Sequence, residues 1–355
     1  MTESDNTSPH PTLDDVASHA GVSPSTASKA LNNRKDVSEA TRQRVLQACA
    51  ELGYQRSTTP ATPTTPHIAI VADNLASTYT MEILKGAAAE AMRHGVPLAL
   101  SYTQLPDTYR EHTLIPLSTP WIARVASEGY IGVITITTPL TPHLATHLSD
   151  AALSHVAIDP ANTPPSGTAS IGATNWNGGR DATQHLIELG HRRIAFIRGS
   201  ENSVPSNERY EGYLSALRMN DLPFDPDLVI DAGFAYGDGV AAGRRLLDLP
   251  SSERPTAIFA CNDSAALGVY EAARERALRI PEDLSVVGFD DTDSARWATP
   301  RLTTVHQPLF EMGARAVQTL LAMHGGEQSL SSTPIRLSTH LVTRDSTAKI
   351  PSEVA

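Results

Sequence analysis

Beyond residue 66 the chain alternates short runs of β-branched residues with longer stretches rich in Ala, Leu, Glu and Arg, and this alternation limits the possible folds more than any other feature. Strand-like runs that alternate with helical stretches predict βαβ units, which form parallel sheets with helices on both faces. The alternation therefore predicts an α/β protein, and the length of the alternating region predicts two such sheets. The expected strands are 67–73, 96–102, 130–137, 154–159, 192–199, 256–263 and 284–291.

The segment that precedes this region predicts three short helices. Thr12 is a suitable N-cap for the first helix, and Gly21 ends it. Ser23 followed by Pro24 is the typical start of a second helix, and Ser38 caps a third. Three short helices with a glycine-containing turn between the first two predict a helix-turn-helix unit over residues 12–56. The buried stripe of the third helix is expected to contain Val45, Leu46, Cys49 and Leu52.

Residues 57–67 read as a linker. They carry prolines at Pro60, Pro63 and Pro66 and show no apolar periodicity, which predicts an extended conformation close to polyproline II. Prolines three residues apart would each remove a helical hydrogen bond or clash with the preceding turn, at about 3 kcal/mol apiece. A helix is therefore not expected in this segment.

The composition is that of a soluble protein of the cytoplasm. No apolar run approaches the roughly 20 residues of a membrane span, and residues 1–12 lack the pattern of a secretory signal. Cys49 and Cys261 are the only cysteines, which argues against a disulfide framework or a thiolate metal site. Residues 1–56 carry six basic and seven acidic side chains, so −10 of the net charge of −11 lies on the rest of the chain. The first segment can approach phosphate groups, whereas the remainder repels them.

The segment 12–54 closely resembles the head of the lactose-repressor (LacI/GalR) family. The resemblance rests on Asp15-Val16-Ala17, on Ala20-Gly21-Val22-Ser23, on Thr26, Ser28, Leu31 and Asn32 of the second helix, and on Leu52-Gly53-Tyr54. The segments 175–199, 209–213, 255–291 and 300–317 resemble the effector domain of the same family. The resemblance implies a homodimer that reads a palindromic operator in double-stranded DNA and is controlled by a small molecule. We therefore expect a transcriptional regulator, and a repressor of carbohydrate-utilisation genes in particular.

The resemblance also implies a domain plan. The body would be a two-lobed domain similar to periplasmic sugar-binding proteins of type I, spanning residues 68–347. We expect the N-terminal lobe to contain 68–172 and 302–328, and the C-terminal lobe to contain 173–301 and 329–347. The family's usual hinge helix carries a leucine that wedges into the minor groove. The linker here has no leucine, so we expect the operator to be bound with little central kinking.

Residue roles on DNA follow from positions in the motif. Ala27, Ala30 and Leu31 form the buried side of the second helix, which turns Pro24, Ser25 and Lys29 toward a major groove. These three occupy the family's base-reading positions, and lysine can donate to guanine O6 and N7. On a lone helix the same residues would be only a solvated face. We expect phosphate contacts or helix caps at Thr12, Ser23, Thr26, Ser28 and Asn32.

The effector is expected beyond the carboxyl ends of the strands, between the lobes. In the resembling family, positions matching Asp159, Arg209, Asn262 and Asp290 commonly bond the effector, the position matching Phe234 packs a ring on it, and Tyr79 lies on a contacting loop. Carboxylates, a guanidinium and a ring suit a sugar. Asp263 is more typical of a helix N-cap, and Phe234 alone would more often be core. Arg209 with Asp290 is the pair on which the site depends most.

Other functions are less well supported. An enzyme would need a nucleophile with its base, paired carboxylates or a metal cluster, and His143 with His147 is the only metal-like helical pair. No glycine-rich phosphate loop follows any expected strand, so no motif indicates a nucleotide cofactor. We therefore expect neither a cofactor nor a metal. A transport protein could share the two-lobed body but would need export. Induction by a sugar is the default mode of control, with corepression as the alternative.

Overall fold

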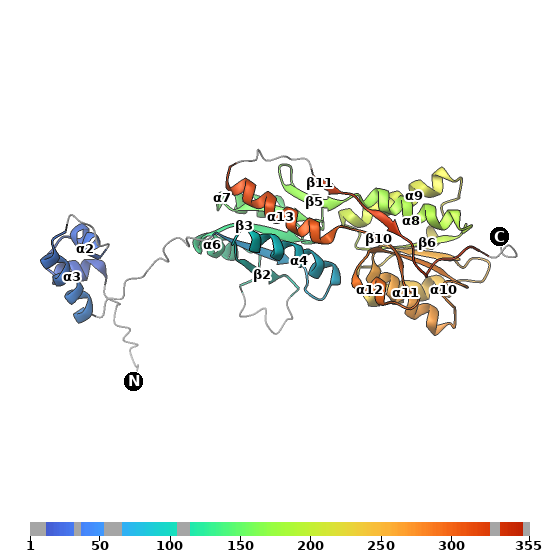
Figure 1. Ribbon diagram of the computed structural model, residues 1–355, viewed down its shortest axis with the longest axis horizontal. Helices are drawn as coiled ribbons and strands as arrows, with labels where there is room; N and C mark the ends of the chain where they lie inside the picture. The colour runs from blue at the N-terminus through green and yellow to red at the C-terminus, as the bar shows by residue number, and fades with distance from the viewer. Residues whose placement is uncertain (1–11, 32–36, 53–65, 105–113, 327–333, 351–355) are drawn as a thin grey trace, which may run out of the picture. The chain divides into compact units, whose positions relative to one another are not determined.

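The computed structural model describes residues 12–31, 37–52, 66–104, 114–326 and 334–350. It divides into two compact units, Met1–Thr62 and Pro63–Ala355, which are considered separately (Figure 1). The proline-rich linker lies outside these ranges, apart from its last two residues.

The described residues of the first unit form a bundle of three helices, α1 (Leu13–His19), α2 (Pro24–Leu31) and α3 (Glu39–Leu52). The predicted caps are present, since the Ser23 and Ser38 hydroxyls accept hydrogen bonds from the backbone N–H groups of Thr26 and Thr41. The predicted stripe on α3 was wrong at one position, because Leu46 is 46% exposed and Ala48 is buried instead. At 100° per residue, positions 45, 48, 49 and 52 share one face, whereas 46 is turned away from it.

In the second unit, the residues that the structure describes form two six-stranded sheets. The first sheet has the order β11-β5-β4-β3-β1-β2, and all of its strands are parallel. Helices α4 and α13 cover one face and α6 and α7 the other, each with its own buried apolar cluster. Its elements are β1 (His67–Ala72), α4 (Thr78–Arg93), β2 (Leu98–Tyr102), α6 (Thr119–Ser127), β3 (Tyr130–Ile136), α7 (Pro142–Asp150), β4 (Ser154–Ile158), β5 (Ala169–Ala173), α13 (Leu309–His324) and β11 (Ile335–Leu337).

The second sheet has the order β12-β10-β9-β8-β6-β7 and is parallel except for its last pair, β10 with β12. Helices α8 and α9 cover one face, and α10 and α11 cover the other. Its elements are α8 (Asn175–Glu188), β6 (Ile194–Arg198), α9 (Val204–Met219), a 3₁₀ turn (Pro226–Leu228), β7 (Val229–Asp231), α10 (Tyr236–Leu247), β8 (Ala257–Ala260), α11 (Asp263–Glu275), β9 (Ser285–Asp290), α12 (Asp293–Trp297), β10 (Thr303–His306) and β12 (His340–Val342).

Two short segments lie in lobes other than those predicted. The strand Thr303–His306 belongs to the second sheet, although 302–328 was assigned to the N-terminal lobe. The strand Ile335–Leu337 belongs to the first sheet, although 329–347 was assigned to the C-terminal lobe. The chain therefore crosses between lobes three times, after β5, after β10 and after β11. Each misplaced strand is only three or four residues long, too short to show a pattern of its own.

Close packing between α4 and α13 fixes the segment at which the chain returns to the first lobe after β10. A Cβ atom on Gly86 of α4 would lie 1.8 Å from the Phe310 carbonyl oxygen, and one on Gly313 of α13 would lie 2.0 Å from the Ile83 carbonyl oxygen. Both glycines are needed because the two backbones touch directly. The start of α13, which carries Leu309 and Phe310, is thereby held against α4.

Candidate functional site

Helix α2 of the head has one buried and one exposed side. Ala27 and Ala30 are buried in the head's apolar core. Pro24, Ser25 and Lys29 are exposed. The three residues predicted to read bases therefore share the solvent-facing side of a helix whose other side is fixed, and their contact with DNA stays a prediction.

The hydroxyl residues predicted to contact phosphate hold the ends of the helices. The Thr12 hydroxyl donates to Asp15 Oδ2 at 2.7 Å and accepts from the Asp15 backbone N–H at 3.3 Å. The Ser23 hydroxyl lies 2.8 Å from that of Thr26 and accepts from the Thr26 N–H at 3.1 Å. Capping is thus the role that the geometry supports for these three. The remaining predicted contacts are Ser28, which is half-buried, and Asn32, which lies outside the described residues.

Tyr79 on α4 and Asp159 at the carboxyl end of β4 form a bonded pair in the first lobe. The Tyr79 hydroxyl donates to Asp159 Oδ2 at 2.6 Å. Asp159 is 2% exposed, and its Oδ1 has no hydrogen-bond partner. Burial raises the pKa of Asp159 above its ordinary value, although the Tyr79 hydrogen bond and the Arg209 charge oppose that shift. The residue also has a φ of +41°, a backbone strain that is common at functional sites.

In the second lobe, the candidate site is centred on Arg209 of α9 and on Asp290 at the carboxyl end of β9. Arg209 Nη1 lies 3.7 Å from Asp290 Oδ1 and donates to the Cys261 carbonyl at 2.6 Å. Its Nε donates to Asn175 Oδ1 at 2.9 Å, and its guanidinium lies 3.8 Å from the centre of the Phe289 ring. Burial raises the pKa of Asp290 well above its usual range, against the opposing charge of Arg209. The predicted pair is therefore brought together and fixed on every side.

Gln307 is a site residue that the sequence analysis missed. It follows β10 at the crossing into α13, is 2% exposed, and donates from Nε2 to Asp290 Oδ1 at 2.7 Å. Its Oε1 is buried without a partner. The only sequence signal was its place after a strand, and that strand is too short to have been recognised. Gln307 presents an acceptor next to the carboxyl group of Asp290.

Two predicted effector residues are already engaged by the protein. Asn262 is the N-cap of α11, since its Oδ1 accepts from the Ala265 N–H at 2.9 Å, and its Nδ2 donates to the Phe234 carbonyl at 2.9 Å. The ring of Phe234 is half-buried and packs against Gly199. The cap of α11 was expected at Asp263, so that interpretation was wrong by one residue. Asn262 has both of its amide groups occupied, which leaves it a positioning role.

Asp263 and Asp291 hold together the part of the second lobe that supports the site. Asp263 accepts from the Thr292 N–H at 2.8 Å and from the Thr304 hydroxyl at 2.6 Å, and burial raises its pKa to about 6. Asp291 accepts from Arg344 and lies 3.0 Å from His306 Nδ1. Burial would raise the pKa of Asp291, but these hydrogen bonds hold it below its ordinary value. Asp291 is therefore a structural residue.

A polar chain crosses between the lobes behind these groups. Arg336 on β11 of the first sheet donates from Nη2 to Glu208 Oε1 on α9 of the second lobe at 2.8 Å. The Asn175 amide then donates to Glu208 Oε2 at 3.1 Å and accepts from Arg209 at 2.9 Å. A Cβ atom on Gly172 would lie 2.6 Å from Arg336 Nη1 and 2.8 Å from Asp159 Oδ1, which places the guanidinium close to Asp159. No pattern in the sequence predicted this network.

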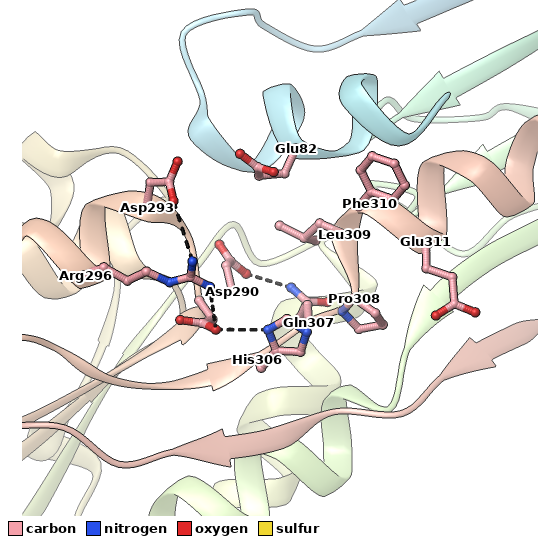
Figure 2. A pocket seen from close by; sticks show the side chains of 11 residues that line it. Glu82, Asp290, Asp293, Arg296, His306, Gln307, Pro308, Leu309, Phe310 and Glu311 are labelled. Carbon is pink, nitrogen blue, oxygen red and sulfur yellow. Dashed lines mark hydrogen bonds and ion pairs between the residues drawn. The ribbon is translucent and has the colours of Figure 1, made fainter. Parts of the chain in front are cut away.

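A pocket of about 300 Å³ lies between the lobes, in front of Asp290 and Gln307 (Figure 2). Its first-lobe wall comes from Glu82 on α4 and from the start of α13, and its second-lobe wall from the segments that follow β9 and β10. Its size falls at the lower end of small-molecule sites. Arg209 and Asp159 are buried beside this pocket and do not line it. The pocket is lined by Glu82, Asp290, Asp291, Asp293, Arg296, His306, Gln307, Pro308, Leu309, Phe310 and Glu311.

Comparison with known proteins identifies both units. Residues 12–57 match the model of bacterial regulatory proteins of the lacI family, and residues 183–347 match a periplasmic binding protein-like domain. The HTH-type transcriptional repressor PurR of Haemophilus influenzae (strain PittEE) is 32% identical over 346 residues, which cover 96% of this chain and 99% of that protein. The chain belongs to the lacI family. It is a DNA-binding transcriptional regulator with a small-molecule-binding domain, as the motifs in both halves predicted, and not an enzyme.

Solved structures of lacI-family regulators share the whole architecture. The complex of the transcriptional regulator CelR with cellobiose is 32% identical, with a TM-score of 0.70 over 95% of this chain and 99% of that one. The lac repressor dimer bound to operator and an anti-inducer is 27% identical, with a TM-score of 0.69 over 96% and 100%. The predicted combination of a helix-turn-helix head and a two-sheet effector domain is thereby confirmed. In the described part of this lacI-family chain, no helix has the length and apolar character needed to cross a bilayer.

Proposed function

We propose that this lacI-family protein is a cytoplasmic, homodimeric repressor of carbohydrate-utilisation genes, and that a sugar bound between its lobes controls its affinity for a palindromic operator. The observation that carries the effector part is the hydrogen-bonded pair Asp290–Gln307 in the lining of the pocket, with Arg209 buried behind Asp290. The side chains of Asp290 and Gln307 line a pocket whose other wall belongs to the other lobe. A ligand that bonds both walls would favour a closed arrangement of the lobes.

On DNA, Lys29 is assigned the main base contact, with Pro24 and Ser25 beside it. All three are exposed on α2, and of the three only lysine combines a positive charge with donors for guanine O6 and N7. Thr12, Ser23 and Thr26 would hold the ends of the helices and also contact phosphate groups of the DNA. Ser28 and Asn32 would make further contacts with the DNA backbone. The proline-rich linker should permit binding with little bending of the operator centre.

In the effector domain, Tyr79, Asp159, Arg209, Asp290 and Gln307 are assigned to the ligand. They lie at strand ends and helix starts of both lobes, and two of their oxygen atoms are buried without partners. Asn262 and Phe234 would act by positioning these groups. Support for a sugar comes from the similarity to the CelR complex with cellobiose, since hydroxyl groups are the donors that such acceptors need.

Homodimerisation is proposed from two observations. The similar lac repressor was solved as a dimer on its operator. In the second lobe, Tyr236 and Trp297 are 49% and 74% exposed, and Tyr236 lines an apolar groove with Leu267 and Tyr270. Exposed apolar patches of this kind are typical of interfaces, and a second copy of the chain is the occupant we assign to it.

The test selects genomic fragments with purified full-length protein and then measures binding to the enriched palindrome by fluorescence anisotropy at physiological salt. Specific binding should exceed binding to arbitrary duplex by at least a factor of about 10³. Cellobiose should weaken it if the sugar is an inducer, and strengthen it if the sugar is a corepressor. Binding that is equal on both duplexes, with and without sugar, would refute the proposal.

A further inference from the structure

Carboxyl groups dominate the lining of the pocket between the lobes. Among the described residues around it, the side chains with titratable groups are five acids, one arginine and one histidine. The acids come from both walls: Glu82 and Glu311 from the first lobe, and Asp290, Asp291 and Asp293 from the second. Figure 2 shows Glu82 facing the second-lobe groups across the opening.

Both basic groups of the lining are already engaged by acids. Arg296 lies 3.5 Å from Asp291 Oδ2 and 3.9 Å from Asp293 Oδ1. His306 lies 3.0 Å from the same Asp291 oxygen. On the opposite wall, Glu82 pairs at 2.5 Å with Lys85, which does not line the pocket. An incoming anion would therefore meet cations whose positive charge is already offset by neighbouring carboxylates.

The uncommitted polar atom at the bottom of the pocket is an acceptor. Gln307 Oε1 is buried without a hydrogen-bond partner, because the amide is oriented by its Nε2 donating to Asp290. A buried acceptor without a partner costs about 1–3 kcal/mol, so a ligand that donates to it is favoured. Hydroxyl groups can donate to Gln307, whereas phosphate and carboxylate oxygens only accept.

We propose that the effector of this pocket carries no negative charge: it is a neutral, hydroxyl-rich ligand that rests on Pro308, Leu309 and Phe310 and donates to Gln307 and Asp290. Sugar phosphates and sugar acids are disfavoured by charge repulsion from the acidic lining on both walls. This inference rests on the proposed effector site and narrows its ligand class.

The first experiment measures the charge of the pocket without any effector. Phe310 is 51% exposed and lines the pocket, so Phe310→Cys places a thiol there. The variant, in a Cys49→Ser background, is reacted at low salt with a methanethiosulfonate that carries a quaternary ammonium group and with one that carries a sulfonate. The ratio of the two rates is compared with that at Ser251→Cys, an exposed site elsewhere in the same unit. We expect the ratio of the cationic to the anionic reaction rate to be about tenfold higher at position 310 than at position 251. Equal ratios at the two sites would overturn the proposal.

The second experiment uses matched ligand pairs on the full-length protein. Calorimetry with cellobiose against cellobionate, and with ribose against ribose 5-phosphate, should show the neutral member binding at least about tenfold more tightly in any pair that binds. An anion that binds as tightly as its neutral counterpart would overturn the proposal. If the neutral sugar binds but leaves operator affinity unchanged, the charge inference stands and the proposed regulatory function fails.

A charge-removal variant tests the cause. Glu82→Gln with Asp293→Asn should reduce the rate ratio at position 310 and the preference between matched ligands by about tenfold. The control is Asp150→Asn with Glu253→Gln, which removes two exposed charges from the segments that precede β4 and β8, at the opposite ends of the strands. A change of the same size in the control would show that net charge of the protein, and not the pocket, governs selection.

Discussion

Lys29 and its neighbours on α2 are exposed, whereas Asp159, Arg209 and Asp290 of the effector domain are 2%, 3% and 4% exposed. The two regions are both proposed to bind polar partners, but they keep their polar groups in different states before binding. The face of α2 that we propose to read DNA is exposed to solvent, on a short helix whose other side is packed. The effector site has removed its charged groups from water and compensates them with each other.

This difference predicts how the two regions respond to change. Removing an exposed group from α2 should alter DNA binding and little else, because surface changes are usually within ±0.5 kcal/mol of neutral for folding. Removing a buried charge from the effector site leaves its partner uncompensated and should destabilise the whole domain. Loss of effector response in such a variant must therefore be read together with its stability.

The largest effect is expected for Arg209→Ala. The guanidinium is bonded to the Cys261 carbonyl and to Asn175, and lies 3.7 Å from Asp290. Its removal therefore takes away the counter-charge of a buried carboxyl group and a donor from each of two acceptors. We expect a loss of about 3–5 kcal/mol in the free energy of unfolding, measured by urea denaturation. The control is Arg218→Ala, an exposed arginine on the same helix. A loss at Arg209 no larger than at Arg218 would show that the pair is not a folding element.

Acid is expected to destabilise the effector domain through buried histidines. Burial lowers the pKa of His155 and of His191 to about 4, against about 6.5 in the unfolded chain. The unfolded state then binds more protons between these values, so the stabilising contribution is complete above pH 6.5 and is lost as the pH falls toward 4, by up to about 3 kcal/mol per histidine. In the described part of the head only His19 is present, and it is exposed.

The slope of stability with pH provides the measurement. Urea midpoints of His191→Asn between pH 7 and pH 4.5 should fall less steeply than those of the wild type. Asp263 acts in the opposite direction, because its folded pKa of about 6 exceeds the unfolded value, so its charged form costs stability above pH 6 and that cost disappears on acidification. Asp263→Asn should therefore steepen the acid loss. Parallel curves for wild type and His191→Asn would contradict the assignment.

A smaller effect, and one confined to DNA, is expected for Lys29→Ala. Loss of a base contact should weaken binding to the selected operator by about 1–3 kcal/mol and relax selectivity at one base pair, with unfolding unchanged. The readout is anisotropy on the operator and on single-substitution variants of it. Lys349→Ala removes an exposed lysine outside the head and serves as the control. A uniform loss across all sequences would reassign Lys29 to the phosphate backbone.

Sequence patterns predicted the elements that repeat and missed those that do not. The seven expected strands and the three head helices all form, because each has its own periodicity or cap. The strands β5, β7, β10, β11 and β12 were not recognised, since three to five residues carry little pattern and their pairing is decided by distant strands.

The effector site shows the same limit. Arg209 and Asp290 were paired correctly from their positions in a motif, whereas Gln307, Glu208 and Arg336 were missed. The missed residues lie at or across the crossings between lobes, so their neighbours are far away in sequence. Asn262 was predicted by motif position to bind ligand, but local geometry shows that its amide caps α11. A single sequence does not distinguish a cap from a ligand group when both follow a strand.

The smallest predicted effect concerns the ion pair that joins the lobes. Arg336 and Glu208 are bonded at 2.8 Å, but their side chains are 35% and 30% exposed, so screening by water limits the pair to about 0.5–1 kcal/mol. A double-mutant cycle with Arg336→Met and Glu208→Gln should return a coupling energy of that size in unfolding experiments. The pair also links Asp159 in one lobe to Asn175 and Arg209 in the other, so the same cycle measured on effector affinity should give a coupling at least as large. A coupling energy in unfolding without one in effector affinity would mean that the pair holds the lobes together but does not contribute to effector binding.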